Sequence, residues 1–287
     1  MVATPIGNLA DVSLRAIHVL SLVDAVACED TRHSAALLRH LGLDKPLLAV
    51  HQHNEQQAAG AVLARLARGE RVAYVSDAGT PAISDPGAAL VHAVRSAGFT
   101  CIPVPGASSA VAALSVAGDT VGAGFAFIGF LPARGGERTL ALQALATACG
   151  TQVLFEAPHR IEALAQSLAL ACGTRPVTLC RELTKQFESV TTLSAADLPA
   201  WLSADANRLR GEFVLVLHGI AAATDTQAAA HDATLQLLLA ELPLKQAVAL
   251  AAGLTGAPRN ALYARALVLK NAAPADTAVD APASPAS

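Results

Sequence analysis

Short runs of apolar and β-branched residues alternate with longer segments of helical pattern in the first part of the chain. The runs are VDAVACED (residues 23–30), RVAYVSDAG (71–79) and FTCIPVPG (99–106), and each ends in turn or polar residues. Such alternation predicts a parallel sheet layered with helices. Ligands of these sheets sit beyond the carboxyl ends of the strands, so we expect the chemistry at Asp30, Asp77 and 105–109.

A second series of strand-like runs follows residue 118. It consists of FAFIGFLP (125–132), TQVLFEAPHR (151–160), PVTLCRELTK (176–185) and EFVLVLHG (212–219). Between two of them, Ile161, Leu164, Ala165 and Leu168 recur at the spacing of one helix face, which predicts a helix from Arg160 to Leu170. We therefore predict two α/β domains, over residues 1–118 and 119–222.

The last part of the chain has a different composition. Residues 223–232 are polar and alanine-rich, which we interpret as a linker, and 233–271 contain two amphipathic stretches around GLTG that resemble a helix-turn-helix. This helical segment is locally basic, which fits docking on a phosphate backbone, although a solvated helix face is the alternative. Residues 272–287 are proline-rich and lack bulky apolar side chains, so we expect a disordered tail.

The overall charge and the cysteines narrow the classes of protein. A formal net charge of -3 and a pI near 6.3 exclude a globally basic nucleic-acid binder but allow a local basic surface. No apolar run reaches the ~20 residues of a membrane span, and the first residues lack a signal-peptide pattern. Five cysteines without a C-x-x-C pair fit reduced thiols, each of which we expect to be buried and inert, and we expect a cytoplasmic protein. His51 and His53 lack a third well-spaced ligand, and we expect no metal.

The loop SDAGTPAISDPG (76–87) is the most informative motif. It carries two carboxylates, and no Lys or Arg occurs between Arg71 and Arg95, which argues against phosphate. Carboxylates and close backbone approach suit an ammonium, a sulfonium or ribose hydroxyls instead. The alternative is a plain link from strand to helix, with Asp85 as N-cap and Pro86 at the first helical position. We assign 77–81 to a ligand and 85–87 to capping.

Four further motifs are less specific. CEDTRH (28–33) offers either a site or a capped helix with a surface ion pair. FEAPHR (155–160) and CRELTK (180–185) place several ionisable groups at strand ends, which is typical both of a site rim and of solvated salt bridges. TPIGN (4–8) is a glycine turn, and Asp11, Ser13 and Leu14 indicate a helix start.

Seven motifs, taken together, resemble those of one family. They are TPIGNLAD, EDTRHS, HNEQ, VSDAGTPAISDPG, FEAPHR, RELTK and ELPLKQAVALAA. It is that of the cytidine 2'-O-methyltransferases of small-subunit ribosomal RNA, in the tetrapyrrole methylase superfamily. The resemblance implies S-adenosylmethionine as methyl donor, two α/β domains with the donor in the cleft between them, and a homodimer. It also implies a decoding-region cytidine of 16S rRNA as substrate. Alternatives are a methyltransferase of small, tetrapyrrole-like molecules and a non-catalytic RNA-binding assembly factor.

The resemblance also assigns residues by motif. Donor contacts are expected from Thr4, Pro5, Gly7, Asp77, Ala78, Gly79, Thr80, Pro81, Ser108, Ser109, Glu156, Pro158 and Arg181. Our candidates for a general base are Glu182, Asp30 and His159. We expect RNA contacts from Arg32, Lys185, Lys245, Arg259, Arg265 and Lys270.

Overall fold

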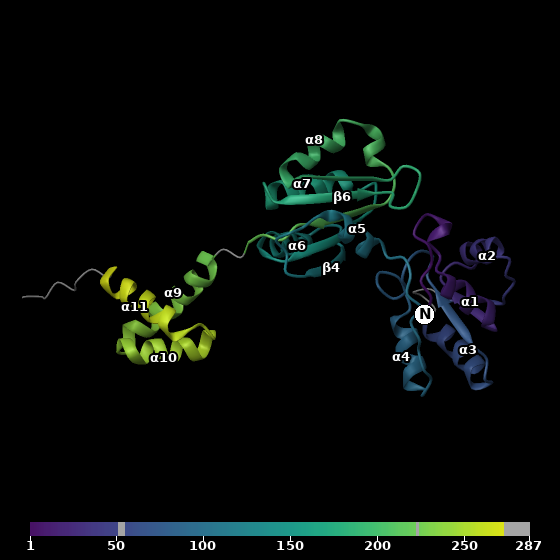
Figure 1. Ribbon diagram of the computed structural model, residues 1–287, viewed down its shortest axis with the longest axis horizontal. Coiled ribbons are helices and arrows are strands. Elements are labelled where there is room, and N and C mark those ends of the chain that lie inside the picture. The colour runs from purple at the N-terminus through teal and green to yellow at the C-terminus, as the bar shows by residue number, and fades with distance from the viewer. Residues whose placement is uncertain (51–54, 222–223, 273–287) are drawn as a thin grey trace, which may run out of the picture. The chain divides into compact units, whose positions relative to one another are not determined.

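The computed structural model describes residues 1–50, 55–221 and 224–272, and the chain divides into two compact units at residues 220 and 221. In the described residues, the first unit contains two sheets and the second contains three helices (Figure 1). His51, His53 and residues 273–287, for which we predict a tail, lie outside the described residues.

The first sheet is parallel, as the sequence predicts. Its order is β2 (Leu47–Ala49), β1 (Ala25–Cys28) and β3 (Val72–Val75), and Cys28 pairs with both Ala49 and Val75, so the three carboxyl ends are level. The three-residue strand β2 escaped prediction. The run 99–106 contributes only an isolated bridge between Val104 and Val2, which corrects our expectation of a full strand there.

Alternation along these strands divides the apolar residues between two helical layers. Val26 and Val75 pack toward α1 (Leu14–Leu22) and α2 (Thr31–His40). Tyr74 packs toward α3 (Glu55–Ala67) and α4 (Ala88–Ser96) on the other face. Ser13 caps α1 through a hydrogen bond from the amide of Ala16, which confirms the predicted helix start just after the short 3-10 turn η1 (Leu9–Asp11).

The second sheet is mixed. Its order is β4 (Phe125–Phe130), β5 (Thr151–Glu156), β8 (Phe213–Leu217), β6 (Pro176–Arg181) and β7 (Ser189–Ser194). Only β4 and β5 are parallel, and every pairing of β8 and β6 is antiparallel. The polar strand β7 was not predicted, because its sequence SVTTLS has no apolar run.

Helices cover one face of this sheet with leucine-rich sides. They are α6 (Gly136–Thr147), α7 (Ile161–Cys172) and α8 (Leu198–Ser203), with two 3-10 turns, η2 (Ala195–Asp197) and η3 (Ala206–Leu209), nearby in sequence. The helix predicted from residue 160 is confirmed as α7, and its four periodic residues are fully buried: Ile161, Leu164, Ala165 and Leu168.

Helix α5 (Ser109–Ala117) covers the other face. Its alanines Ala110, Ala113 and Ala117 pack with Val153, Val214 and Val216 of the second sheet. We had placed residues 109–117 in the first domain, but their packing belongs to the second sheet. The helix follows the first sheet in sequence, and its alanine face gives no signal of which sheet it will cover.

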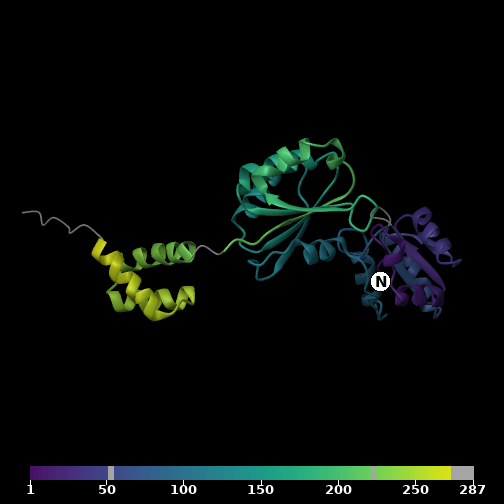
Figure 2. The same cartoon turned by 45° about the horizontal axis from the view of Figure 1, so that its top comes forward.

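The helical unit consists of α9 (Thr224–Glu241), α10 (Leu244–Thr255) and α11 (Arg259–Ala272) (Figures 1 and 2). These helices pack around Leu235, Val248 and Leu262. Our linker is wrong for residues 224–232, which form the first half of α9, because alanine is the strongest helix former. Gly256 ends α10 in the left-handed conformation, as the GLTG turn predicts. Within the described part of the chain, no helix is long and apolar enough to span a membrane.

The five cysteines are free thiols. Cys28 and Cys180 are buried, and burial raises the pKa of Cys180 to about 11, which makes its thiol inert. Cys149 is exposed, so burial does not describe all five as we had expected.

Candidate active site

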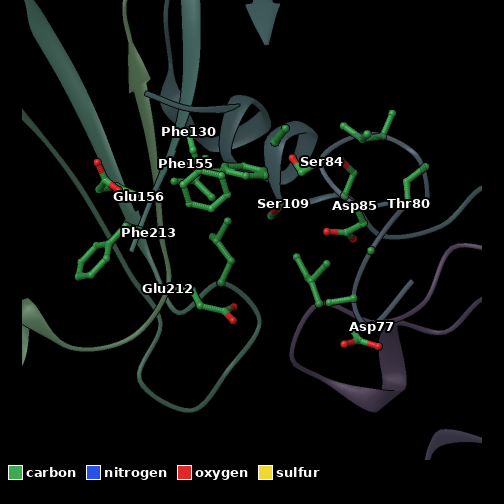
Figure 3. A pocket seen from close by; sticks show the side chains of 18 of the residues that line it. Asp77, Thr80, Ser84, Asp85, Ser109, Phe130, Phe155, Glu156, Glu212 and Phe213 are labelled. Atoms are coloured by element: carbon green, nitrogen blue, oxygen red, sulfur yellow. The ribbon is translucent and has the colours of Figure 1, made fainter. Parts of the chain in front are cut away.

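A cavity of about 460 Å³ lies in the first unit at the carboxyl ends of β1 and β3. This volume falls within the usual range of small-molecule sites. Loop 77–85 and the start of α5 form one side, and β4, β5 and the beginning of β8 form the other (Figure 3). The lining residues are Ile6, Glu29, Asp77, Ala78, Gly79, Thr80, Ile83, Ser84, Asp85, Ser108, Ser109, Ala110, Phe130, Phe155, Glu156, Ala157, Pro158, Leu183, Glu212, Phe213 and Val214.

Thr4 holds the predicted ligand loop in place. Its amide donates to the carbonyl of Gly79 at 2.9 Å, and the Gly79 amide donates back to the Thr4 carbonyl at 3.1 Å. Gly79 has φ +75°, a conformation that favours glycine, and the Thr80 hydroxyl donates to the Ala107 carbonyl at 3.0 Å. Asp77 to Thr80 line the cavity, whereas Thr4, Pro5 and Pro81 do not. Thr4 is 3% exposed and is placed to position the loop.

Asp85 does not cap α4, which corrects our capping assignment for residues 85–87. The helix begins at Ala88, its N-cap is Gly87, and no side chain caps it. The Tyr74 hydroxyl donates to the Pro86 carbonyl at 2.9 Å, and a Cβ on Gly87 would meet the Tyr74 ring at 2.8 Å. This contact with β3 keeps Pro86 out of the helix and leaves Asp85 on the cavity wall.

Five carboxylic residues line the cavity, and its lining, drawn from the described residues, contains no Lys, Arg or His. Burial raises the pKa of Glu29, and the charges of Asp77 and Asp85 raise it further. Burial also raises the pKa of Asp85, and a hydrogen bond with Ser76 only partly opposes this. The cavity is therefore strongly anionic, and a cationic ligand fits it better than phosphate.

Glu156 lines the cavity at the end of β5 but directs its carboxylate elsewhere. Its Oε1 accepts from the Ala157 amide at 2.9 Å and lies 3.0 Å from Arg160 Nε. Side chains alternate along a strand, so Glu156 and Phe155 point to opposite faces, and Figure 3 shows the Glu156 carboxylate beyond the Phe155 ring. Its Oε2 is buried and has no hydrogen-bond partner among the described residues. His159, in the turn that follows, is exposed and does not line the cavity.

Asp30 forms the capped helix start that we had kept as the alternative. Its carboxylate accepts from the Arg32 amide at 2.8 Å and pairs with the Arg32 guanidinium at 2.7 Å. The Arg32 hydrogen bonds lower the pKa of Asp30 to about 2. Asp30 does not line the cavity, although its amide donates to Asp77 Oδ1 at 3.1 Å.

Glu182 lies in a hydrogen-bonded loop next to the cavity. Its Oε1 accepts from Lys185 Nζ at 2.9 Å and from the Glu212 amide at 2.8 Å. Burial acts to raise the pKa of Glu182, but the bonds from Lys185 and Glu212 outweigh it, and the pKa lies below its usual value. The Arg181 guanidinium donates to the carbonyls of Phe187 and Arg210. Neither Glu182 nor Arg181 lines the cavity.

Gly7 brings the TPIGN turn against this loop. The next amide, of Asn8, donates to Thr184 Oγ1 at 3.1 Å. A Cβ on Gly7 would lie 2.5 Å from Lys185 Cγ and 3.0 Å from the Leu183 carbonyl oxygen. Close approach of two backbones therefore requires glycine at position 7, although Gly7 itself does not line the cavity.

The six basic residues predicted to contact RNA fall into two groups. Arg32, Lys185 and Arg265 pair with carboxylates; the partner of Arg265 is Asp232 of α9, at 2.5 Å. Asp232 precedes residues 233–271, the segment that the sequence indicates to be locally basic. Lys245, Arg259 and Lys270 are exposed on the helical unit.

Sequence reasoning missed the aromatic wall and two acids. Phe130 and Phe155 meet edge to face at 5.8 Å, and both line the cavity (Figure 3). Each stands at or near the end of a strand-like run, which is a signal that could have identified it. The two acids are Glu29, which directly precedes our candidate Asp30, and Glu212, which directly precedes β8.

Comparison with known proteins is decisive for the family. The profile of the Tetrapyrrole (Corrin/Porphyrin) Methylases matches residues 1–199. The chain belongs to the tetrapyrrole methylase family. A profile described as the RsmI C-terminal HTH domain matches residues 225–270, which covers most of the helical unit of this tetrapyrrole methylase.

Curated relatives place the chain more closely. It is 47% identical over 270 residues to the ribosomal RNA small subunit methyltransferase I of Pseudomonas aeruginosa, covering 93% of this chain and 95% of that one. It is 46% identical to the protein of the same name from Escherichia coli O157:H7, with 93% of each chain covered. This tetrapyrrole methylase is therefore a methyltransferase of the ribosomal RNA small subunit methyltransferase I family.

A solved structure shares the fold. It is the uroporphyrin-III C-methyltransferase of Thermus thermophilus complexed with S-adenyl homocysteine, with a TM-score of 0.52 and 18% identity. The alignment covers 75% of this chain and 94% of that one, so the common architecture spans nearly the whole of the solved chain.

Proposed function

We propose that the protein transfers the methyl group of S-adenosylmethionine to the 2'-hydroxyl of a cytidine ribose in the decoding region of 16S rRNA. The observation that carries the proposal is the anionic cavity whose described lining lacks a basic residue. S-adenosylmethionine has an ammonium, a sulfonium and ribose hydroxyls, and these groups suit carboxylates. The names of the curated relatives support ribosomal RNA as the acceptor.

The residues of the cavity fit this donor in type and position. Asp77 and Asp85 would face its cationic groups, and Thr80 and Ser109 offer hydroxyls on the same side (Figure 3). The aromatic wall on the opposite side would cover a flat, apolar base. When bound, the donor supplies an electrophilic methyl carbon. The chain contributes mainly by alignment, since transfer of this kind depends on holding nucleophile, methyl group and leaving group in line.

The helical unit supports an RNA substrate over a small molecule. Lys245, Arg259 and Lys270 are exposed there, and each can neutralise a phosphate. A tetrapyrrole-like acceptor has no need of such a surface. The third possibility, an assembly factor without catalysis, gives no reason for a ligand-sized anionic cavity. We accordingly propose action on the small ribosomal subunit in the cytoplasm.

We also propose that the enzyme works as a homodimer. Strand β4 is an edge of the second sheet, and Phe125 and Ile128 on it are 56% and 41% exposed. Large apolar side chains on an edge strand favour contact with another protein surface. Equilibrium sedimentation tests this, and a monomer at micromolar concentration would contradict it.

The direct test is methyl transfer from labelled donor to purified small subunits, followed by nuclease digestion and mass analysis of the modified nucleoside. We expect a 2'-O-methylcytidine. A modified base would contradict the acceptor atom, and unmodified RNA would contradict catalysis. A labelled small tetrapyrrole would favour the alternative substrate.

A second test addresses the loop. Asp77→Ala should abolish donor binding in calorimetry, because it removes a carboxylate that lines the cavity. Asp77→Asn keeps an oxygen that can accept from the Asp30 amide and isolates the effect of charge. Asp44→Ala, an exposed aspartate in the loop before β2, is the matched control. Unchanged donor affinity in both Asp77 variants would refute the loop assignment.

A further inference from the structure

We propose that Glu29, and not its neighbour Asp30, is the catalytic residue that accepts the proton of the acceptor hydroxyl. The inference rests on the proposed function. It concerns a residue that lines the cavity and that sequence reasoning passed over by one position.

The end of β1 places Glu29 at the cavity. Strand β1 ends at Cys28, whose partner in β3 is Val75, so the segments that follow both strands leave the sheet at one level. The Asp30 amide then donates to Asp77 Oδ1 at 3.1 Å, which ties the end of β1 to the ligand loop. Glu29 lies between the strand and this tie and lines the cavity, whereas Asp30 turns outward to cap α2.

The other carboxylates of the cavity lining interact with neighbouring groups. The Glu156 carboxylate is bound to Arg160, and Glu212 lies 3.0 Å from Lys185 Nζ. Asp77 accepts the Asp30 amide, and Ser76 acts to lower the pKa of Asp85. Among the described residues, no hydrogen-bond donor or cation contacts the Glu29 carboxylate. Glu29 thus has both oxygens available to an incoming hydroxyl.

The surroundings of Glu29 make its carboxylate more basic. The groups that face Glu29 from the ligand loop are Asp77 and Asp85, and Asp30 is next to it in sequence; all are acids. Burial and these negative charges raise the pKa of Glu29, which makes its carboxylate a better proton acceptor. The two other carboxylates that we had considered are poorer bases, because hydrogen bonds lower the pKa of both Asp30 and Glu182.

In the proposed reaction, Glu29 accepts the hydroxyl proton while the hydroxyl oxygen forms a bond to the methyl carbon. The bond from that carbon to sulfur breaks, and its electron pair stays on sulfur. The sulfonium loses its positive charge and the carboxylate its negative charge, so no net charge is created in the cavity. The proton leaves Glu29 for water after the products dissociate.

The test compares Glu29→Gln with the wild type, with Glu162→Gln as matched control on the exposed side of α7. Glutamine keeps the size and removes the base. We expect methyl transfer to fall by about 10²- to 10⁴-fold, while calorimetric donor affinity falls by no more than about tenfold, because one of the carboxylates that attract a cation is removed. Glu29→Gln should also abolish the acidic limb of the pH–rate profile. In the wild type, that limb should show an apparent pKa above the ordinary 4.5 of a glutamic acid.

A second measurement does not depend on turnover. Titration of the Glu29 side-chain carboxyl carbon by NMR should give a pKa above 4.5, and Asp85→Asn should lower it. Transfer by Glu29→Gln within threefold of the wild type, or loss of donor affinity in proportion to transfer, would overturn the inference. Loss of transfer in Asp30→Asn with Glu29→Gln active would overturn it as well. Absence of donor binding to the wild type would instead refute the proposed function on which the inference depends.

Discussion

Asp119→Asn is the substitution whose effect on stability follows most directly from the structure. Asp119 lies after α5, and its Oδ1 accepts from the amides of Val121 and Gly122 at 2.9 and 3.1 Å. Its Oδ2 accepts from the Gly219 amide at 2.7 Å and the Thr151 hydroxyl at 2.5 Å. Asparagine can keep the first pair of bonds. Its NH₂ group cannot accept the second pair. The Thr151 hydroxyl can instead accept from this group, but the Gly219 amide loses its acceptor.

The size of the effect follows mainly from the lost bond to Gly219. A hydrogen bond to a charged group contributes about 1.5–3 kcal/mol, and the three bonds that remain lose the charge of their partner. Asp119 is only half-buried, and water can replace part of what is lost. We expect the free energy of unfolding of the first unit to fall by roughly 2–3 kcal/mol near neutral pH.

The effect should also depend on pH. Burial acts to raise the pKa of Asp119, but the hydrogen bonds from Thr151, Gly219, Val121 and Gly122 outweigh it and hold the pKa far below the ordinary 3.8. A depressed pKa in the folded state adds stability above the unfolded pKa, and this stability is lost as pH falls through the folded value. The difference between wild type and Asp119→Asn should therefore be full at neutral pH and shrink below pH 3.8.

Urea unfolding followed by tryptophan fluorescence measures this. Trp201 is the only tryptophan in the chain, and it packs against the core of the second sheet, so it reports on the right unit. Asp44→Asn, an exposed aspartate, is the control. Equal stability of Asp119→Asn and wild type at neutral pH would refute the reasoning. So would a difference that persists unchanged at acid pH.

Two further predictions concern the site and the helical unit. Gly7→Ala should push away the loop at Leu183 to Lys185 and weaken calorimetric donor affinity by about tenfold, since overpacking costs about 1–3 kcal/mol. Gly60→Ala, on a helix with nothing near the added methyl, should leave donor affinity unchanged. Replacing Lys245 and Arg259 by alanine should weaken binding to small subunits in filter assays and reduce the salt dependence by about two phosphate contacts. Donor affinity should not change, and equal loss of both affinities would contradict a docking role.

The architecture was predictable where a local pattern determines it. The runs 23–30 and 71–79 became parallel strands because alternation buries one set of side chains on each face. The helix at 161–172 followed from four apolar positions on one side. The course of α5 was not predictable, because an alanine-rich helix matches either sheet equally well and only tertiary packing decides.

The site was predictable only at the ends of parallel strands. The rule that ligands lie at carboxyl ends located Asp77, but β8 runs antiparallel to β5, with Val214 opposite Phe155. The amino end of β8 therefore meets the cavity, and no rule about carboxyl ends could have found Phe213 or Glu212. The choice between Glu29 and Asp30 depends on a single position in the transition from β1 to α2, which composition and spacing do not resolve.

The acids of the cavity carry a cost in stability that connects the site to its ligand. The pKa values of Glu29 and Asp85 are raised in the folded chain, so these groups add stability only below their unfolded pKa and lose it as pH rises through the folded value. At neutral pH the two carboxylates therefore oppose folding. A bound cation offsets their mutual repulsion, whereas an anionic or neutral ligand does not. A cavity that gathers like charges in this way binds a sulfonium donor more tightly than the product, whose thioether sulfur is uncharged. Methyl transfer should therefore itself lower the affinity of the cavity for its ligand.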